Sequence, residues 1–387
     1  MRVGINARIL TVPSLRGWNR YTVNLLSELG GLGVELFLYS HQAVHPDHLA
    51  RLQPGSFTQR LAPPLPYILW EQHWLPRQCA ADRLDVLHST FNFGLPFSTP
   101  CPRILTLHDA IDQIYYHPIR TLRQKLSRNV LETGFYRWVA RARADHIIAV
   151  SAYACNEIAQ VLHVPVSKMT VTLAAADPQF HRPIPEHEVL AALERHGLER
   201  PYFFYAGGWE GRKNIPFLVR AFAAADVEGV DLVLVGGKAE EKIEMEKLAR
   251  EVRVSGRLRL LGWLSDPDLR ALYRGARAFV YPSRHEGFGL QACEAMAVGC
   301  PVLVANASSL PEVVGTGGET FSLDGTEELT GLLQRVVRDD QYRESLVKRA
   351  AARSANLSWR KTAEQTLAVY RKVLKGKSHS GQKAETA

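Results

Sequence analysis

YPSRHEGFGLQACEAMAVGCPVLV, residues 281–304, is the part of the sequence that most constrains how this chain folds. An aromatic residue and turn residues come first, and a glycine-flanked loop at 286–290 leads into a largely apolar helical pattern. Gly299 stands where a C-terminal glycine cap belongs, and the short apolar run 302–304 comes soon after it. The predicted order is therefore strand, loop, helix and strand.

The loop before this helix is predicted to bind an anion. Its backbone N–H groups point at whatever lies over the helix start, and the helix dipole adds partial positive charge there. The residues that supply these amides are Phe288, Gly289 and Leu290. A phosphate group is the most natural ligand for such a site.

Two acidic residues bracket the same loop. Glu286 lies on the loop, whereas Glu294 lies inside the helix and shares a face with Leu290 and Ala297. Burying a polar group without a partner costs about 2–7 kcal/mol, so a carboxylate on that face needs one. Either a core backbone N–H or an arginine satisfies Glu294, or ligand hydroxyls beside the phosphates do. The grouping of both acids with the glycines favours the ligand.

The bulk composition indicates a globular protein of two domains. A chain of 387 residues is too long for one ordinary core. Its 46% hydrophobic and 22% charged residues are typical of a folded chain. Five cysteines without a CxxC pair indicate buried thiols in a reducing compartment. Neither a signal-peptide hydrophobic region nor a membrane span of ~20 apolar residues is evident, so we expect a cytoplasmic protein.

The net charge of +8 favours anionic partners. Nucleic acid is not expected, because no zinc spacing, RNA-recognition signature or helix-turn-helix pattern accompanies the charge. A nucleotide-sugar or an anionic lipid surface would account for it equally well. Between Tyr115 and Arg143, basic residues alternate with aromatic and aliphatic ones. This segment fits a helix on the inner face of the cytoplasmic membrane and a solvated helix face equally well.

Short β runs alternate with helical patterns along the chain, which predicts a parallel sheet covered by helices in each half. The expected strands are 3–6, 34–39, 85–88, 104–107, 147–150 and 169–173 in the first half, and 202–206, 232–235, 258–261, 278–281, 302–304 and 320–323 in the second. Prolines at 178, 183 and 185 mark the expected hinge. The predicted organisation is a domain at 1–180, a domain at 181–358, a helix at 359–375 with packing on the first domain as one option, and a disordered tail at 376–387.

A second glycine loop, 207–214, follows the first strand of the second half. Arg212 can bond two phosphate oxygens through its guanidinium, and Lys213 adds a point charge, so the loop suits a diphosphate. A surface turn with solvated charges is the alternative. The spacing matches neither a Walker loop nor a dinucleotide-binding fingerprint.

The first half of the chain contains candidate ligand-binding residues with a weaker sequence signal than the loops at 207–214 and 286–290. Gly17 and Asn19 lie in a loop between the first strand and a helix, where a simple βα turn is the expected interpretation for this loop on its own. His108 and Asp109 close the strand 104–107, at the sheet edge where ligands collect. That position makes His108 a candidate substrate contact or proton carrier, against the alternative of a structural histidine.

No metal site is expected. Asp266-Pro267-Asp268 has the spacing of a divalent-metal motif, but Asp266 is predicted to cap the helix 269–274, with Pro267 in its first turn. No cluster of histidine, cysteine or acidic residues has zinc-ligand spacing.

In these motifs and their order along the sequence, the chain resembles glycosyltransferase family 4, the group 1 retaining glycosyltransferases. The likeness covers nearly the whole chain and is strongest at the run from Glu286 to Glu294, with support from residues 308–315, from the Arg-Lys-Asn run at 212–214 and from Val150-Ser151. The resemblance implies the α/β fold called GT-B, in which two Rossmann-like domains with parallel sheets face a central cleft. The first domain would bind the acceptor and the second the nucleotide-sugar donor.

The same resemblance implies roles for single residues. Glu286 would contact the donor sugar, and the backbone of Phe288 to Leu290 would lie against sugar and phosphate. Glu294 would bind the ribose, and Lys213 and Arg212 would bind the diphosphate. His108 would be an acceptor-side histidine beside the sugar. Two positions depart from the family pattern. Gly208 stands where many members place a diphosphate-binding arginine. Asn19 replaces a second glycine of the N-terminal loop, where its side chain would either narrow the choice of acceptor or remodel that loop.

The resemblance implies transfer of a hexose, with mannose as one option, from a nucleoside diphosphate with retention at the anomeric carbon. The acceptor would be a glycan or a lipid-linked sugar of a surface polysaccharide, and the reaction would use no cofactor and no metal. A nucleotide-sugar 2-epimerase of the same fold is the alternative, because it needs no acceptor. A nucleic-acid-binding module is a third hypothesis that rests on the charge alone.

Overall fold

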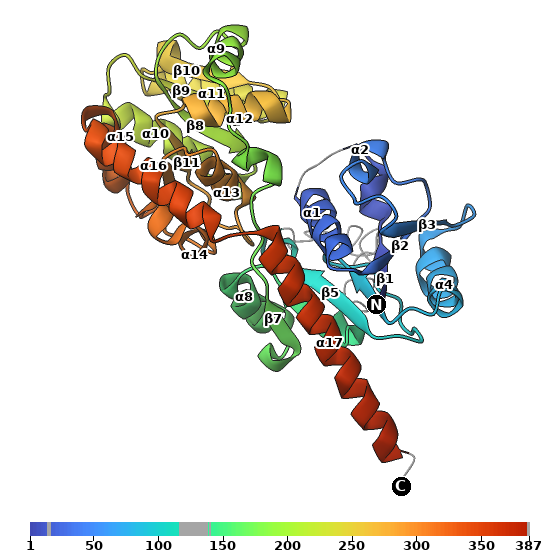
Figure 1. Cartoon of the computed structure of the whole chain (residues 1–387). Coiled ribbons are helices and arrows are strands. Elements are labelled where there is room, and N and C mark those ends of the chain that lie inside the picture. Colours follow the sequence, from blue (N-terminus) through green and yellow to red (C-terminus); the bar gives the residue numbers. More distant parts are fainter. Residues whose placement is uncertain (14–16, 116–137, 139–140, 385–387) are drawn as a thin grey trace. The chain divides into compact units, whose positions relative to one another are not determined.

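The structure is a computed structural model that describes residues 1–13, 17–115, 138 and 141–384 in two compact units (Figure 1). The first unit comprises Met1–Ala174 together with Trp359–Ala387, and the second comprises Ala175–Ser358. The chain therefore leaves the first unit before the proline cluster, ahead of the boundary predicted at residue 180. The predicted basic segment 115–143 lies outside the described residues except for 115, 138 and 141–143.

Seven parallel strands form the sheet of the first unit in the order β3-β2-β1-β4-β5-β6-β7. The strands are β1 (Arg2–Asn6), β2 (Glu35–Ser40), β3 (Phe57–Leu61), β4 (Val86–Ser89), β5 (Arg103–Leu107), β6 (His146–Ala149) and β7 (Met169–Val171). The helices described for this unit are α1 (Trp18–Gly31), α2 (Pro46–Leu49), α3 (Tyr67–Leu69), α4 (Leu75–Ala81), α5 (Ile111–Tyr115), α8 (Ala152–Leu162) and α17 (Trp359–Ala384). Side chains such as Val3 and Ile5 are fully buried, as a parallel sheet covered by helices requires.

Six parallel strands form the sheet of the second unit in the order β10-β9-β8-β11-β12-β13. The strands are β8 (Tyr202–Gly207), β9 (Asp231–Gly236), β10 (Leu258–Leu261), β11 (Ala278–Tyr281), β12 (Val302–Ala305) and β13 (Glu319–Phe321). The helices are α9 (Glu186–Arg195), α10 (Ile215–Ala225), α11 (Ala239–Glu251), α12 (Asp266–Gly275), α13 (Leu290–Ala297), α14 (Leu310–Val314), α15 (Glu327–Arg338) and α16 (Asp340–Ala355). Strands β8 and β11 are neighbours, and this adjacency builds the site described below.

Strand β3 was not predicted from the sequence. It pairs only with β2 at the edge of the first sheet, and each of its residues from Phe57 to Arg60 is half-buried. Its central Thr-Gln-Arg segment lacks the continuous apolar run that identifies a strand buried on both faces. Strand β3 therefore carries a weaker sequence signal than the central strands of its sheet.

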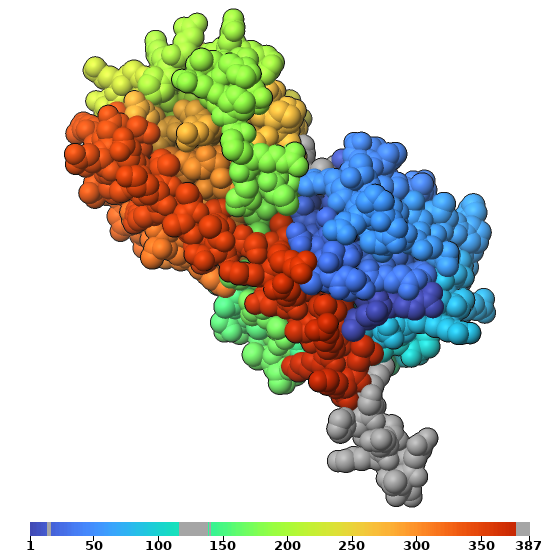
Figure 2. All heavy atoms as spheres, in the orientation of Figure 1, coloured from blue at the N-terminus to red at the C-terminus, as the bar shows by residue number. Residues whose placement is uncertain are grey.

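Helix α17 packs against the first unit after the chain has returned from the second (Figure 2). Tyr370 Oη lies 2.7 Å from His88 Nδ1 on β4, and Thr362 Oγ1 donates to the Leu173 carbonyl at 2.5 Å. The rings of Trp359 and Tyr21 meet edge to face, 5.4 Å apart. These contacts fix the first turns of the helix, and each further residue then adds one backbone hydrogen bond. Helix α17 is described as far as Ala384, beyond the end predicted at residue 375, and the expected disorder of the tail stays a prediction.

The start of α12 corrects a second prediction. Ser265, and not Asp266, is the N-cap residue, because its hydroxyl accepts a hydrogen bond from the Asp268 backbone N–H at 3.3 Å. Asp266 is already inside the first turn, where its carboxylate accepts from Gln179 Nε2 at 2.5 Å. Serine and aspartate are about equally good caps, so their order in the sequence could not separate them.

No helix among the described residues is long and apolar enough to cross a membrane.

Candidate active site

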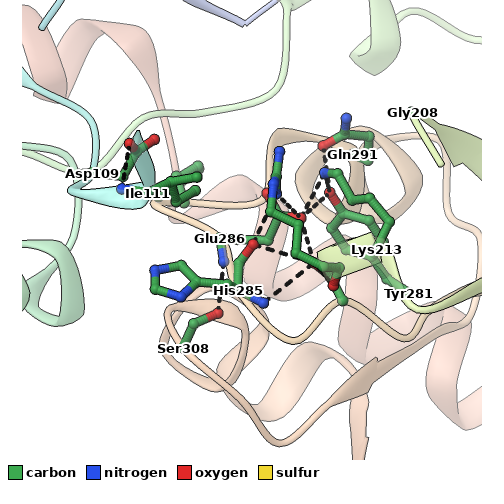
Figure 3. A network of polar contacts seen from close by, with 12 residues as sticks. Asp109, Ile111, Gly208, Lys213, Tyr281, His285, Glu286, Gln291 and Ser308 are labelled. Atoms are coloured by element: carbon green, nitrogen blue, oxygen red, sulfur yellow. Dashed lines mark hydrogen bonds and ion pairs between the residues drawn. The ribbon is translucent and has the colours of Figure 1, made fainter. Parts of the chain in front are cut away.

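The Glu286 carboxylate is the centre of a buried polar network at the carboxyl end of β11 (Figure 3). One of its oxygens, Oε1, accepts hydrogen bonds from Ser283 Oγ at 2.6 Å, Lys213 Nζ at 2.6 Å, Tyr281 Oη at 2.9 Å and Arg212 Nη1 at 3.1 Å. The two basic residues come from the turn after β8, so the network joins the ends of two adjacent strands. The sequence predicted each of these charged residues but not their convergence on one oxygen.

Lys213 and Arg212 place two positive charges beside the Glu286 carboxylate, and Glu210 is a second acidic neighbour of both cations. Burial by itself raises the pKa of Glu286, but the charges of Lys213 and Arg212 outweigh it and hold the pKa below its ordinary value. Burial lowers the pKa of Lys213, against the opposing effect of the carboxylate. The Nε atom of Arg212 is buried and has no hydrogen-bond partner among the described residues. An anion at this place would meet the charges of Lys213 and Arg212.

Serine side chains hold the loop after β11 in shape. Ser308 Oγ accepts from the Glu286 backbone N–H at 3.0 Å, and Ser309 Oγ lies 2.9 Å from the carbonyl oxygens of both Glu286 and Phe288, to one of which it donates. Gly289 has φ of 101°, and a Cβ there would lie 2.7 Å from Leu310 Cδ2. Only glycine fits this position without strain. Helix α13 therefore begins at Leu290.

Glu294 is buried in α13, with 5% of the residue exposed. The predicted burial of this carboxylate on the apolar face is confirmed. The side-chain amide of Gln291, one turn earlier, lies 3.1 Å from Tyr281 Oη, whose single proton goes to Glu286, and this contact links the helix to the Glu286 network. Glu286, the loop 288–290 and Glu294 thus lie in one continuous segment that β11 and α13 hold in place.

His108 stands at the end of β5 in the first unit. Its backbone N–H donates to Asn92 Oδ1 at 2.8 Å, and its Nε2 lies 2.9 Å from the Thr90 carbonyl oxygen. A carbonyl only accepts, so Nε2 carries the hydrogen and Nδ1 keeps a lone pair. The Tyr21 ring packs edge to face on the imidazole at 4.8 Å. Burial lowers the pKa of His108 to about 4, so at neutral pH its Nδ1 is a hydrogen-bond acceptor.

Comparison with known proteins shows which family the chain belongs to. Residues 191–353 match the family described as "Glycosyl transferases group 1", and residues 15–180 match "Glycosyltransferase Family 4". The chain is 31% identical over 298 residues to the O-antigen chain mannosyltransferase B of Escherichia coli, and the match covers 75% of each chain. The chain belongs to the group 1 glycosyltransferases.

Two further likenesses bear on this glycosyltransferase. It is 29% identical over 243 residues to the serotype-specific mannosyltransferase WbdA of Escherichia coli, a match to 60% of this chain and 29% of that one. The fold of Anabaena HepE, whose structure was solved in complex with UDP-glucose, superposes with a TM-score of 0.73 at 16% identity and covers 96% of this chain and 100% of HepE. The expected GT-B class of two α/β units with parallel sheets is thereby confirmed.

In this glycosyltransferase, Asn19 holds the N-terminal loop by a hydrogen bond. The Asn19 side chain donates from Nδ2 to the Ile9 carbonyl at 2.7 Å, which connects the start of α1 to the turn after β1. Gly17 precedes α1 with φ of 45°, and apart from its chain neighbours no atom of the described residues lies within 4 Å of the position that a Cβ would take. Asn19 thus has a structural role in holding the loop, and its predicted effect on acceptor choice stays a prediction.

Sequence reasoning missed three members of the network: Tyr281, Ser283 and Gln291. Each lies inside or next to a stretch that had been singled out, but a hydroxyl or an amide has no charge pattern that marks it. No group of three or more histidine, cysteine or acidic side chains suited to hold a metal ion occurs among the described residues.

The buried histidines of this glycosyltransferase predict a pH-dependent stability. Burial lowers the pKa of His88 to about 3 and that of His108 to about 4. Histidine in an unfolded chain has a pKa of about 6.5, so below that pH the unfolded state binds more protons than the folded one. Stability is therefore expected to fall as the pH drops from about 6.5 towards 4. Urea unfolding at pH 7.5 and pH 5 measures this, and equal midpoints would contradict it. The difference between the two midpoints should shrink in a His108→Gln variant.

Proposed function

We propose that this protein is a retaining glycosyltransferase that moves a hexose, in the first instance mannose, from a nucleoside diphosphate to a glycan or lipid-linked acceptor in surface polysaccharide synthesis. The observation that carries the proposal is the pair of cations, Arg212 and Lys213, that meet at the Glu286 carboxylate, next to the amino end of α13. The names of the similar Escherichia coli mannosyltransferases support the donor sugar and the pathway. The HepE complex with UDP-glucose supports a nucleotide-sugar donor.

The leaving group of this reaction is a nucleoside diphosphate. The bond between the anomeric carbon and the diphosphate oxygen breaks, so negative charge grows on the diphosphate. Arg212, Lys213 and the backbone amides of the 288–290 segment would stabilise that charge, because they are held in place before the reaction begins. The acceptor oxygen then bonds to the same face of the sugar, and its proton passes to the departing phosphate.

Glu286 would stabilise the oxocarbenium-like sugar by charge and not by forming a covalent bond. A carboxylate oxygen that accepts four hydrogen bonds, two of them from cations, is a weak nucleophile. Its lowered pKa keeps it ionised at neutral pH. The protein therefore supplies an electrostatic environment, and the substrates supply the bond-forming atoms.

The test is a panel of GDP-, UDP- and ADP-sugars, each incubated with the protein with and without glycan acceptors. Nucleoside diphosphate release that depends on the acceptor, with an α-linked product from an α-linked donor by NMR, is the expected result. Consumption of the donor without any acceptor would instead indicate the 2-epimerase. No turnover and no binding across the panel would overturn the proposal.

The two cations already in the site support a reaction that needs no metal ion. Arg212 and Lys213 supply the positive charge that a divalent cation supplies in metal-dependent transferases. We expect less than about a twofold change in kcat on addition of EDTA, because no step draws on a Lewis acid. A loss of activity that Mg²⁺ or Mn²⁺ restores would contradict this.

A lipid-linked acceptor would bring the protein to an anionic membrane surface. The first unit carries exposed apolar side chains on and before α3, namely Leu65, Ile68 and Leu69, with 37%, 46% and 43% exposed. These apolar side chains, together with the chain's net charge of +8, favour contact with anionic lipid. Co-flotation with vesicles of phosphatidylglycerol, but not with neutral vesicles, is expected, and an Ile68→Glu/Leu69→Glu variant should float less. Equal recovery with neutral vesicles would contradict it.

A further inference from the structure

Glu210 is an exposed acidic side chain next to the two cations of the candidate active site. It comes directly before the turn Gly211–Lys213, and the Lys213 backbone N–H donates to its carbonyl at 2.7 Å. The negative charge of Glu210 acts on both Arg212 and Lys213. Within the described part of the chain, however, its carboxylate has neither a hydrogen bond nor a direct ion pair. This charge is therefore not neutralised by a direct partner.

The Glu210 carboxylate lies against the bare backbone of Gly208, just after the carboxyl end of β8. A Cβ on Gly208 would lie 2.6 Å from Glu210 Oε2 and 2.7 Å from Oε1, so a side chain at this position would displace the carboxylate. Tyr205 Oη donates to the Gly208 carbonyl at 2.5 Å and holds the same peptide in place. The carboxyl ends of parallel strands are where ligands bind. Glu210 thus places a negative charge at the ligand-binding end of β8.

With Glu210 included, the site holds two positive and two negative side chains. Arg212 and Lys213 are the cations, and Glu286 is the direct partner of both, at 3.1 Å and 2.6 Å. Glu210 adds its negative charge at longer range. An anion bound to the two cations is therefore repelled by Glu210, and this repulsion grows with the charge of the anion.

The product of the proposed reaction carries more negative charge than the donor. In a nucleotide-sugar, the sugar esterifies the terminal phosphate, so each of the two phosphates has one ionised oxygen. When the bond to the anomeric carbon breaks, the terminal phosphate gains a second ionisable oxygen, whose pKa is about 6. The proton that it takes from the acceptor is therefore lost to water near neutral pH, and nearly one further negative charge remains. Glu210 repels this product more strongly than it repels the donor.

We propose that Glu210 promotes release of the nucleoside diphosphate after transfer, by repelling the charge that the product has gained. The inference rests on the proposed function, because it assumes a diphosphate at Arg212 and Lys213. Product release limits the turnover of many enzymes, so a group that selectively weakens product binding speeds the cycle. Glu210 contacts neither the sugar nor the reacting atoms in this role.

The experiment measures by calorimetry how tightly GDP and GDP-mannose, and likewise UDP and UDP-glucose, bind to the unchanged protein and to Glu210→Gln. The variant should bind both members of a pair more tightly. The gain for the nucleoside diphosphate should exceed that for the nucleotide-sugar by a factor of about 1.4 to 5, the range for one exposed charge pair. In about 1 M salt this selective gain should disappear, because the Debye length falls from about 10 Å at 0.1 M to about 3 Å.

Two further variants serve as controls. Glu210→Asp keeps the charge and should stay close to the unchanged protein in all affinities. Glu228→Gln removes another exposed acid of the same unit, three residues before β9 and thus at the amino end of the strand that pairs with β8. It should leave the ratio of the two affinities unchanged. Both Glu210 and Glu228 are exposed, so melting curves of these variants should match that of the unchanged protein.

The outcomes separate this inference from the proposed function. If Glu210→Gln changes the two affinities equally, or changes neither, Glu210 has no selective effect on the product, and the donor proposal still stands. Weaker binding of the nucleotide-sugar alone would assign Glu210 to the sugar and also overturn the inference. A selective gain that persists in high salt would rule out charge repulsion. If the unchanged protein binds none of these ligands, both proposals fail, whereas a salt-sensitive gain for the nucleoside diphosphate supports both.

Discussion

Replacing Lys213 by methionine is expected to lower kcat by about a hundredfold to a thousandfold, the usual cost of removing one preorganised group that stabilises developing charge. The ammonium lies 2.6 Å from Glu286 Oε1 and 2.8 Å from Tyr281 Oη, and only 4% of Lys213 is exposed. Methionine fills a similar volume without the charge, so the packing is kept. The measurement is nucleoside diphosphate release in the presence of the best donor and acceptor.

The same substitution is expected to destabilise the fold. Removing one partner of a buried ion pair typically costs about 3–5 kcal/mol, because the other charge stays buried. Arg212 remains 3.1 Å from the Glu286 carboxylate, so we expect the lower end of that range. Urea unfolding measures the loss in free energy of unfolding.

A double variant tests the source of the lost stability. Lys213→Met combined with Glu286→Gln removes the uncompensated charge, so much of the lost stability should return, while the activity stays low because both groups take part in the reaction. If activity recovered together with stability, neither Lys213 nor the Glu286 carboxylate would be needed for the reaction. If Lys213→Met alone kept its full activity, the diphosphate would be bound elsewhere.

The sequence predicted the strands of both sheets well where they are buried on two faces. Runs such as Tyr202–Ala206 and Ala278–Tyr281 are continuously apolar and end at glycine or turn residues, and the structure places β8 and β11 there. Edge strand β3 was missed because polar side chains interrupt it. The extent of α17 was underestimated because packing of its first turns, which composition does not reveal, sustains the helix.

The candidate site was predicted residue by residue but not as an assembly. Glycine loops and charged residues after strands are visible in a sequence, so Arg212, Lys213 and Glu286 were all identified. Their convergence depends on β8 lying next to β11, although two strands intervene between them in the chain. Strand order comes from packing over the whole sheet, and a local pattern carries no record of it. The same holds for Ser309, which bonds to the loop 21 residues or more before it.

Glu294→Gln is the second variant with a large expected effect. The substitution keeps the shape of the side chain and removes its charge inside α13, where 5% of the residue is exposed. If the carboxylate accepts hydrogen bonds from the ribose hydroxyls, the Kd of GDP or UDP should rise by roughly tenfold to a hundredfold, the range of hydrogen bonds to charged groups. Calorimetry measures the affinity, and a melting curve checks that the fold survives.

Nucleotides without ribose hydroxyls turn this variant into a test of the contact itself. The unchanged protein should bind GDP more tightly than 2′,3′-dideoxy-GDP, and Glu294→Gln should bind both about equally, because the interaction between two groups disappears when either is removed. A variant that melts early yet still distinguishes the two nucleotides would assign Glu294 to the core, paired with a protein group. The amino end of α13 would then act through its amides and through Glu286 alone, since those contacts do not involve Glu294.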